Sequence, residues 1–138
     1  YELLFLESLK LVVRPNHPLL QENVTLSRVL EWPVVVSPEG TAPRQHSDAL
    51  VQSQGCKIPS GCIETLSASL SRQLTVEYDV WFVPSGAVKD DLRHATLVAL
   101  PVPGHGAGEP IGILTRVDAT FSSGCQLMIN AIRKSMPF

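Results

Sequence analysis

The chain has 138 residues, of which 44% are hydrophobic and 17% are charged, and it carries a net charge of −2. This composition suits one globular domain with a core of its own and excludes an intrinsically disordered segment. The lysines and arginines are scattered, which excludes the basic face of a DNA-binding domain, and no run approaches the roughly 20 apolar residues of a membrane span.

The first predicted element is an extended apolar segment at the N-terminus. Residues 1–14, YELLFLESLKLVVR, are interrupted by Glu2, Glu7 and Lys10, and they lack the basic start and the cleavage site of a secretory signal. Within this segment, residues 9–14 predict a strand that ends at the prolines of PNHP, because proline removes backbone donors. The chain opens without methionine and in the middle of a pattern, so we expect it to be part of a longer protein.

Strands and helices alternate along the rest of the chain. After a short helix near residues 26–30, a β-branched run at residues 33–37 predicts a strand that is covered on both faces. Later strands are predicted at residues 62–66, 79–84, 95–102 and 111–117, and helices at residues 41–54, 67–75, 85–93 and 122–135. This alternation predicts an α/β fold with a mostly parallel sheet flanked by helices.

The turn after the first buried strand, in VVVSPEGTAPR, has the features of an anion-binding site. Gly40 permits a backbone conformation that other residues avoid, Thr41 suits a helix N-cap, and Pro43 suits a first helical turn. Free backbone N–H groups, the helix dipole and the hydroxyls of Ser37 and Thr41 favour a carboxylate or phosphate there. The alternative is an ordinary capped helix without a ligand.

Two later strand-to-helix turns carry similar residues. Thr65, Ser67 and Ser69 lie where one predicted strand meets its helix, and Ser67 is the expected N-cap. Pro84 and Ser85 end the next strand. Because ligands of α/β folds bind at the carboxyl ends of parallel strands, the turns together predict a cleft wall for a small anion. The serines and threonines could equally serve as plain caps.

The sequence contains no recognisable catalytic, metal or cofactor motif. Its four histidines are dispersed, and it has no P-loop, dinucleotide fingerprint or nucleophile elbow. Residues 104–108, GHGAG, lack a following helix and predict a connection rather than a phosphate loop. We therefore predict a protein that is not an enzyme and that uses no cofactor or metal. The enzymatic alternative would rest on Cys62 beside Glu64 as a nucleophile.

The three cysteines are expected to be reduced thiols of a cytoplasmic protein. Cys56 and Cys62 are close in sequence, and Cys125 is distant from both. Their spacing does not match a metal knuckle, which needs a second ligand pair. A disulfide between Cys56 and Cys62 remains an open alternative at this stage.

Several segments together resemble the effector-binding domain of LysR-type transcriptional regulators, and they follow the order of that family. The segments are LKLVVRPNHPLL, VTLSRVLEWPVVVSPEGTAPR, IETLSASLSRQL, VWFVPSGAV, LVALPVPG and IGILTRVDATFSSGCQLMINAIR. The resemblance covers nearly the whole chain, and VVRPNHPL, SPEGT and IGILTR are its most specific parts. Within the family, the chain looks most like regulators of protocatechuate and β-ketoadipate catabolism.

The resemblance implies a fold like that of type 2 periplasmic binding proteins, in which two crossing strands join two α/β subdomains around the effector. Residues 9–117 would form the second subdomain with both crossing strands, LKLVV outgoing and IGILT returning. Residues 118–138 would form a terminal helix of the first subdomain, most of which lies outside this chain. The face of that helix with Leu127, Met128 and Ile132 would be exposed or packed against another chain.

The resemblance also implies an effector-binding site by position. Its residues are Ser37, Pro38, Gly40, Thr41, Thr65, Phe82, Val83 and Pro84. Glu39 departs from the apolar or small residue that is usual in this loop. Since like charges repel, Glu39 must point away if the ligand is an acid.

The resulting hypothesis is a cytoplasmic sensor that binds a small aromatic or dicarboxylic acid. It would relay binding to a helix-turn-helix DNA-binding domain absent from this chain, within a homodimer or homotetramer and without contact to a membrane. The expected biological role is control of protocatechuate catabolism. The alternative is an extracytoplasmic solute-binding protein of the same fold.

Overall fold

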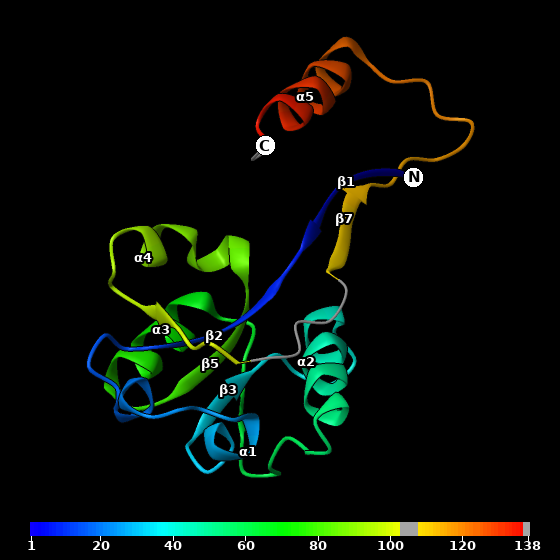
Figure 1. Ribbon diagram of the computed structural model, residues 1–138. Helices are drawn as coiled ribbons and strands as arrows, with labels where there is room; N and C mark the ends of the chain where they lie inside the picture. The colour runs from blue at the N-terminus through cyan, green and yellow to red at the C-terminus, as the bar shows by residue number, and fades with distance from the viewer. Residues whose placement is uncertain (103–107, 137–138) are drawn as a thin grey trace. The chain divides into compact units, whose positions relative to one another are not determined.

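A computed structural model describes residues 1–102 and 108–136 of the chain. The GHGAG segment, predicted to be a connection, therefore lies outside the described residues except for Gly108. The chain divides into a larger compact unit, Ser8–Gly108, and a smaller one formed by Tyr1–Glu7 and Glu109–Phe138 (Figure 1).

The larger unit is built on a five-stranded sheet with the strand order β4-β3-β5-β2-β6. Its strands are β2 (Leu9–Val13), β3 (Val34–Val36), β4 (Ile63–Glu64), β5 (Val80–Pro84) and β6 (Val98–Ala99). Its helices are η1 (Pro18–Gln21), α1 (Leu26–Val29), α2 (Ala42–Ser53), α3 (Ala68–Glu77), η2 (Ser85–Val88) and α4 (Lys89–Arg93), of which η1 and η2 are 3-10 helices. The strands predicted at residues 62–66 and 95–102 are thus much shorter than expected, and the helix predicted at 85–93 is divided in two.

The predicted α/β fold with helices flanking the sheet is confirmed, and the sheet is mixed, with β2 running against the other four strands. β3 pairs in parallel with β4 and β5, whereas β2 pairs antiparallel with β5 and β6. The neighbours of β2 in the sheet do not follow it directly in the chain. The alternation of strands and helices along the sequence therefore does not fix the direction of β2.

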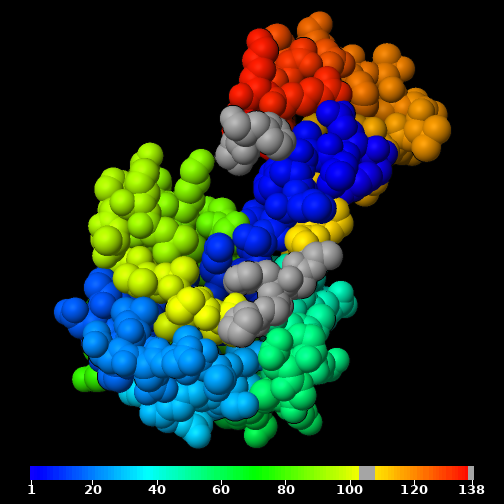
Figure 2. Space-filling model, in the orientation of Figure 1, coloured from blue at the N-terminus to red at the C-terminus, as the bar shows by residue number. Residues whose placement is uncertain are grey.

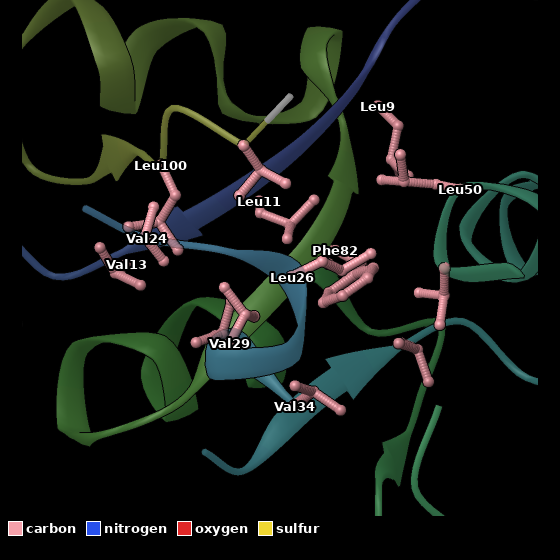
Figure 3. Close-up of a cluster of buried hydrophobic side chains, with 14 of the residues drawn as sticks. Leu9, Leu11, Val13, Val24, Leu26, Val29, Val34, Leu50, Phe82 and Leu100 are labelled. Carbon is pink, nitrogen blue, oxygen red and sulfur yellow. The ribbon is translucent and has the colours of Figure 1, made fainter. Parts of the chain in front are cut away.

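One face of the sheet packs against η1, α1 and α2. Successive side chains of a strand point to opposite faces, so alternate residues of each strand share this core. The strand residues in it are Leu9, Leu11, Val13, Val34, Val36, Val80 and Phe82. They meet Leu26 of α1 and Leu50 of α2 (Figure 3). Leu19 of η1 belongs to the same cluster. Figure 2 shows η1 and α1, in blue, and α2, in blue-green, at the surface of this unit.

The other face of the sheet carries a second apolar cluster. Its strand residues are Val12, Val35, Trp81 and Val83. Val88 of η2 and Leu97 complete the buried cluster, and Leu74 of α3 and Leu92 of α4 pack against it. β2, β3 and β5 are therefore covered on both faces, which explains why their sequences lack polar alternation.

The local signals at the start of α2 and α3 are confirmed. Thr41 is the N-cap of α2, and its Oγ1 accepts a hydrogen bond of 3.4 Å from the Arg44 amide. Gly40 has a φ of +86°, the conformation that favours glycine. Ser67 is the N-cap of α3, and its Oγ accepts a hydrogen bond of 3.1 Å from the Leu70 amide.

The smaller unit consists of an antiparallel pair, β1 (Glu2–Glu7) with β7 (Glu109–Ile113), and helix α5 (Ser123–Lys134). An ion pair of 2.6 Å joins Arg133 of α5 to Glu2 of β1. Ile129 is buried, whereas Leu127 and Met128 are 69% and 66% exposed. Leu127 and Met128 are therefore exposed, which is one of the two alternatives expected for this face.

LKLVV and IGILT, the two predicted crossing strands, do not pair with each other. LKLVV is β2 of the five-stranded sheet, and the strand that pairs with β7 is β1. Both segments are apolar and extended, so only their distant partners distinguish them. The assignment of residues 9–117 and 118–138 to two family subdomains stays a prediction.

Candidate functional site

Neighbouring strands of the larger unit end around one pocket. β4, β3 and β5 are adjacent and parallel, so their carboxyl ends lie at the same edge of the sheet. Ser37 follows β3, Thr65 follows β4, and Phe82, Val83 and Pro84 end β5. All five of these predicted site residues line a pocket of about 190 Å³.

The rest of the pocket lining was not predicted from the sequence. These residues are Pro43, Leu66, Ala68, Ser71, Trp81 and Ala87. Every described side chain of the lining is uncharged. The pocket thus combines hydroxyl groups with a largely apolar wall, a combination that suits a small organic molecule.

The hydroxyl groups of the pocket differ in their availability. Ser71 Oγ donates to the Ser67 carbonyl at 2.8 Å and is therefore engaged. Thr65 Oγ1 accepts from the Ser67 amide at 3.0 Å, which leaves its hydroxyl hydrogen free to donate. The Ser37 hydroxyl has no hydrogen-bond partner among the described residues. Ser37 and Thr65 can therefore donate to a ligand oxygen.

The remaining predicted residues, Pro38, Gly40 and Thr41, do not belong to the described lining of this pocket. Thr41 Oγ1 donates to the Pro38 carbonyl at 2.7 Å, and its hydroxyl also caps α2. Gly40 is exposed at the turn. These residues shape the loop that carries Ser37.

Glu39 lines a different depression, of about 490 Å³, together with Arg44 and Glu64. Its Oε1 lies 3.7 Å from Nη2 of Arg44, and its side chain is 81% exposed. The Glu39 carboxylate is thus directed to a cation instead of the 190 Å³ pocket. Two carboxylates and two cations, Arg44 and Lys57, line the larger depression, so its charges are balanced within the protein.

Arg44 is buried, with a side chain only 8% exposed, and it is surrounded by acceptors. Its Nε donates to Asp48 at 3.0 Å, and its Nη1 donates to Glu64 at 2.7 Å and to the Ser37 carbonyl at 3.2 Å. Burial opposes its charge, but the hydrogen bonds to Glu64 and Asp48 outweigh burial, so the pKa of Arg44 lies above its ordinary value. Arg44 is therefore a permanent cation that connects α2 with Ser37, which follows β3, and with Glu64 of β4.

The position of Arg44 in the sequence indicates that it needs acidic partners. A cation in the first turn of a helix is unfavourable, because the helix N-terminus already carries a partial positive charge. Arg44 occupies the first turn of α2, with Asp48 four positions later on the same helix face. An arginine in such a position is expected to have acidic partners.

A second arginine contacts two residues of the pocket lining, Trp81 and Ala87. The guanidinium of Arg72 lies 5.8 Å from the ring centroid of Trp81 and donates to the Ala87 carbonyl at 3.1 Å. Arg72 also pairs with Asp91 at 3.0 Å, and this hydrogen bond holds the pKa of Asp91 below its ordinary value. These contacts fix one wall of the pocket.

The chemistry around Cys62 does not support the enzymatic alternative. Cys62 is half-buried, and burial raises the pKa of its thiol despite the nearby Arg44. A nucleophilic cysteine needs a lowered pKa instead. Cys56, Cys62 and Cys125 are free thiols, so the alternative of a Cys56–Cys62 disulfide is not realised.

The described residues hold neither a metal-binding cluster nor a membrane-spanning helix. No group of three or more histidine, cysteine or acidic side chains within residues 1–102 and 108–136 is placed to hold a metal ion. Among the same residues, no helix has the length and apolar character needed to cross a bilayer.

Sequence comparison provides relatives that are longer than this chain. The chain is 99% identical over 139 aligned residues to the HTH-type transcriptional regulator YdcI of Escherichia coli strain K12, and it is 27% identical to the regulator PcaQ of Agrobacterium fabrum. The alignments cover 100% and 98% of the chain but only 45% and 44% of those relatives. The chain thus spans about half the length of its relatives.

Solved structures with the same fold include two regulator domains with bound ligands. The effector-binding domain of QuiR in complex with shikimate has a TM-score of 0.72 at 17% identity, with 98% of this chain and 64% of that one covered. The regulatory domain of CcmR from Synechocystis PCC6803 in complex with 2-PG has a TM-score of 0.74 at 14% identity, with 99% and 68% covered. The model of the LysR substrate binding domain family matches residues 1–137, and the chain therefore belongs to this family.

Proposed function

We propose that this chain is the effector-sensing part of a LysR-type transcriptional regulator and that the 190 Å³ pocket takes the acid group of a small organic acid. The observation that carries the proposal is the convergence of Ser37, Thr65 and the end of β5 on one pocket. A buried carboxylate needs hydrogen-bond donors, and the free hydroxyl hydrogens of Ser37 and Thr65 can supply them.

The N-terminus of α3 adds to the anion-binding character of the pocket. Ala68 is the first residue of this helix and lines the pocket. The first N–H groups of a helix lack intrahelical partners and carry a partial positive charge. The apolar wall with Leu66 and Trp81 would accept the rest of the ligand. An aromatic or unsaturated acid fits both features.

The proposed mechanism is a shift between conformations. A ligand changes a conformational equilibrium only through its different affinity for the two states. A bound acid would stabilise one state, and a homodimer or homotetramer would relay the change to a helix-turn-helix domain outside this chain. The family match favours this function over that of an extracytoplasmic solute-binding protein.

The likeness to PcaQ supports a finer hypothesis, that the effector belongs to aromatic catabolism and to the protocatechuate pathway. Titration calorimetry of the intact regulator with protocatechuate and with β-carboxymuconate tests this hypothesis directly. If neither acid binds, the pathway assignment fails. A panel of other aromatic and dicarboxylic acids, including shikimate, then tests the sensor class.

Substitution of the pocket hydroxyls tests the site. Ser37→Ala removes a free donor, and we expect the affinity for the bound acid to fall about tenfold, the effect of one charge-assisted hydrogen bond. Calorimetric titration of the variant measures this change. Ser60→Ala is the matched control, because Ser60 lines the larger depression and not this pocket. Equal affinities of Ser37→Ala and wild type would exclude the pocket as the acid site.

A further inference from the structure

The turns that carry Ser37 and Thr65 share one buried cation. Nη1 of Arg44 donates to the Ser37 carbonyl at 3.2 Å and to Glu64, the residue before Thr65, at 2.7 Å. Arg44 does not belong to the described lining of the 190 Å³ pocket, so it acts on the site only through these neighbours. We propose that Arg44 is a positioning residue that fixes the Ser37 and Thr65 turns relative to each other and thereby sets the affinity of the pocket for an acid.

The need for such a residue follows from the strand that carries Thr65. β4 has only two residues and lies at the edge of the sheet, where β3 is its neighbour. The Thr65 amide donates to the Val36 carbonyl at 3.1 Å, which extends the pairing by one bond. So short an edge strand has few ladder bonds to hold it. The ion pair of Arg44 with Glu64 adds an anchor from the side chains.

An arginine suits this position better than a lysine. The planar guanidinium presents five donors in a fixed arrangement, whereas an ammonium is a point charge on a flexible stem. Arg44 uses Nε for Asp48 on α2 and Nη1 for the Ser37 carbonyl and Glu64. The planar group therefore fixes the directions from α2 to both turns. The Arg44 side chain is only 8% exposed, whereas Asp48 and Glu64 are 39% and 40% exposed, so solvent screens these ion pairs in part.

Several carboxylates surround Arg44, so its removal is expected to change the positions of the residues around it. Glu39, Asp48 and Glu64 all lie within 4.0 Å of its guanidinium nitrogens. Without the cation, these carboxylates repel one another, and Glu64 would move away from the helix. Such a movement would displace Thr65 and change the separation of the two donors of the pocket. This consequence rests on the function proposed above, but the anchoring itself does not.

Hydrogen exchange of the intact, ligand-free protein tests the anchoring. The variants are Arg44→Gln, which removes the cation, and Arg44→Lys, which keeps the charge but not the planar fork. In Arg44→Gln we expect exchange of the Thr65 amide to accelerate at least about tenfold, with an intermediate increase in Arg44→Lys. The amides of Val80 and Leu100 in the core should exchange as in the wild type. Mass spectrometry or NMR resolves these sites.

Arg28→Gln is the matched control. Arg28 also forms ion pairs with two glutamates, Glu22 and Glu31, but none of these residues lines the pocket. Its removal should leave exchange at Thr65 unchanged. If the Thr65 amide of Arg44→Gln exchanged at the wild-type rate, the proposal would be overturned. An increase that is equal at Thr65, Val80 and Leu100 would also overturn it, because that result indicates a general loss of stability.

Titration with protocatechuate separates this proposal from the proposed function. Where the wild type binds this acid, we expect Arg44→Gln to bind it at least about tenfold more weakly at a temperature at which the variant is folded. Unchanged affinity would refute the role of Arg44 in the site. If the Thr65 amide responds as expected while the wild type binds no organic acid, the anchoring stands and the function proposed for the pocket fails.

Discussion

The two compact units of the chain differ in how much apolar surface they bury. In the larger unit, residues from both faces of the sheet form separate buried clusters. In the described residues of the smaller unit, Ile129 is the one buried hydrophobic, while Leu3, Leu114 and Leu127 are more than half exposed. A packed core stabilises the larger unit, whereas strand pairing and the ion pair between Glu2 and Arg133 order the smaller one. The structure of the larger unit is thus specified by its own residues.

The core of the larger unit offers the strongest test of this contrast. Phe82 is only 1% exposed and lies in the cluster between the sheet and α1 and α2. We expect Phe82→Ala to lower the free energy of unfolding by about 3–5 kcal/mol, because it leaves a cavity in a packed core. Urea denaturation followed by circular dichroism measures the change. Phe121→Ala, at a residue of the smaller unit that is 40% exposed, is the control and should cost far less.

Substitution of His17 is expected to lower the free energy of unfolding by an intermediate amount that depends on pH. It is fully buried, its Nδ1 accepts from the Leu19 amide at 3.1 Å, and its Nε2 lies 3.4 Å from the Tyr78 carbonyl. We expect His17→Leu to cost about 1–3 kcal/mol, because the Leu19 amide and the Tyr78 carbonyl lose their partner. Denaturation at neutral pH measures this cost.

The pH dependence follows from the buried state of His17. Burial lowers the pKa of His17 from its ordinary value of 6.5, so the folded protein keeps the ring neutral while the unfolded chain takes up a proton. Its contribution to stability is complete above about pH 6.5 and is lost as the pH falls towards the folded-state pKa. His17→Leu should remove this part of the acid sensitivity. His94→Gln, at an exposed histidine, should retain it.

A substitution on the exposed face of α5 is expected to change the free energy of unfolding least. Leu127 is 69% exposed, so Leu127→Ser removes few contacts. We expect the free energy of unfolding of the larger unit to change by less than about 0.5 kcal/mol. A loss comparable to that of Phe82→Ala would show that the two units share a common unfolding transition and would remove the contrast drawn above. Denaturation curves recorded with a probe in the larger unit provide the measurement.

Local features of the fold were predictable from the sequence. The apolar runs that became β3 and β5 lack polar alternation because both of their faces are covered. Thr41 and Ser67 were identified as N-caps because a hydroxyl there can satisfy a free amide of the next turn. These signals lie within a few residues of one another, so the sequence alone reveals them.

Features that depend on distant partners were not predictable in the same way. β1 and β2 are both short apolar segments, and the partners that place them in different sheets, β7 and β5, lie far along the chain. Of the predicted site, Ser37, Thr65 and the end of β5 converge, because parallel strands end at a common edge. The contact of Arg44 with Glu64 joins residues 20 positions apart, and no local pattern encodes it.

The two outermost strands of the five-stranded sheet, β4 and β6, have a consequence for solubility. Each is only two residues long, and β4 ends in the charged Glu64. Such a short edge strand offers a strand of another chain very few free carbonyl and amide groups. The carboxylate of Glu64 also opposes the pairing of two copies at this edge. We therefore expect the larger unit to pair with strands of other chains less readily than a sheet with long exposed edge strands does.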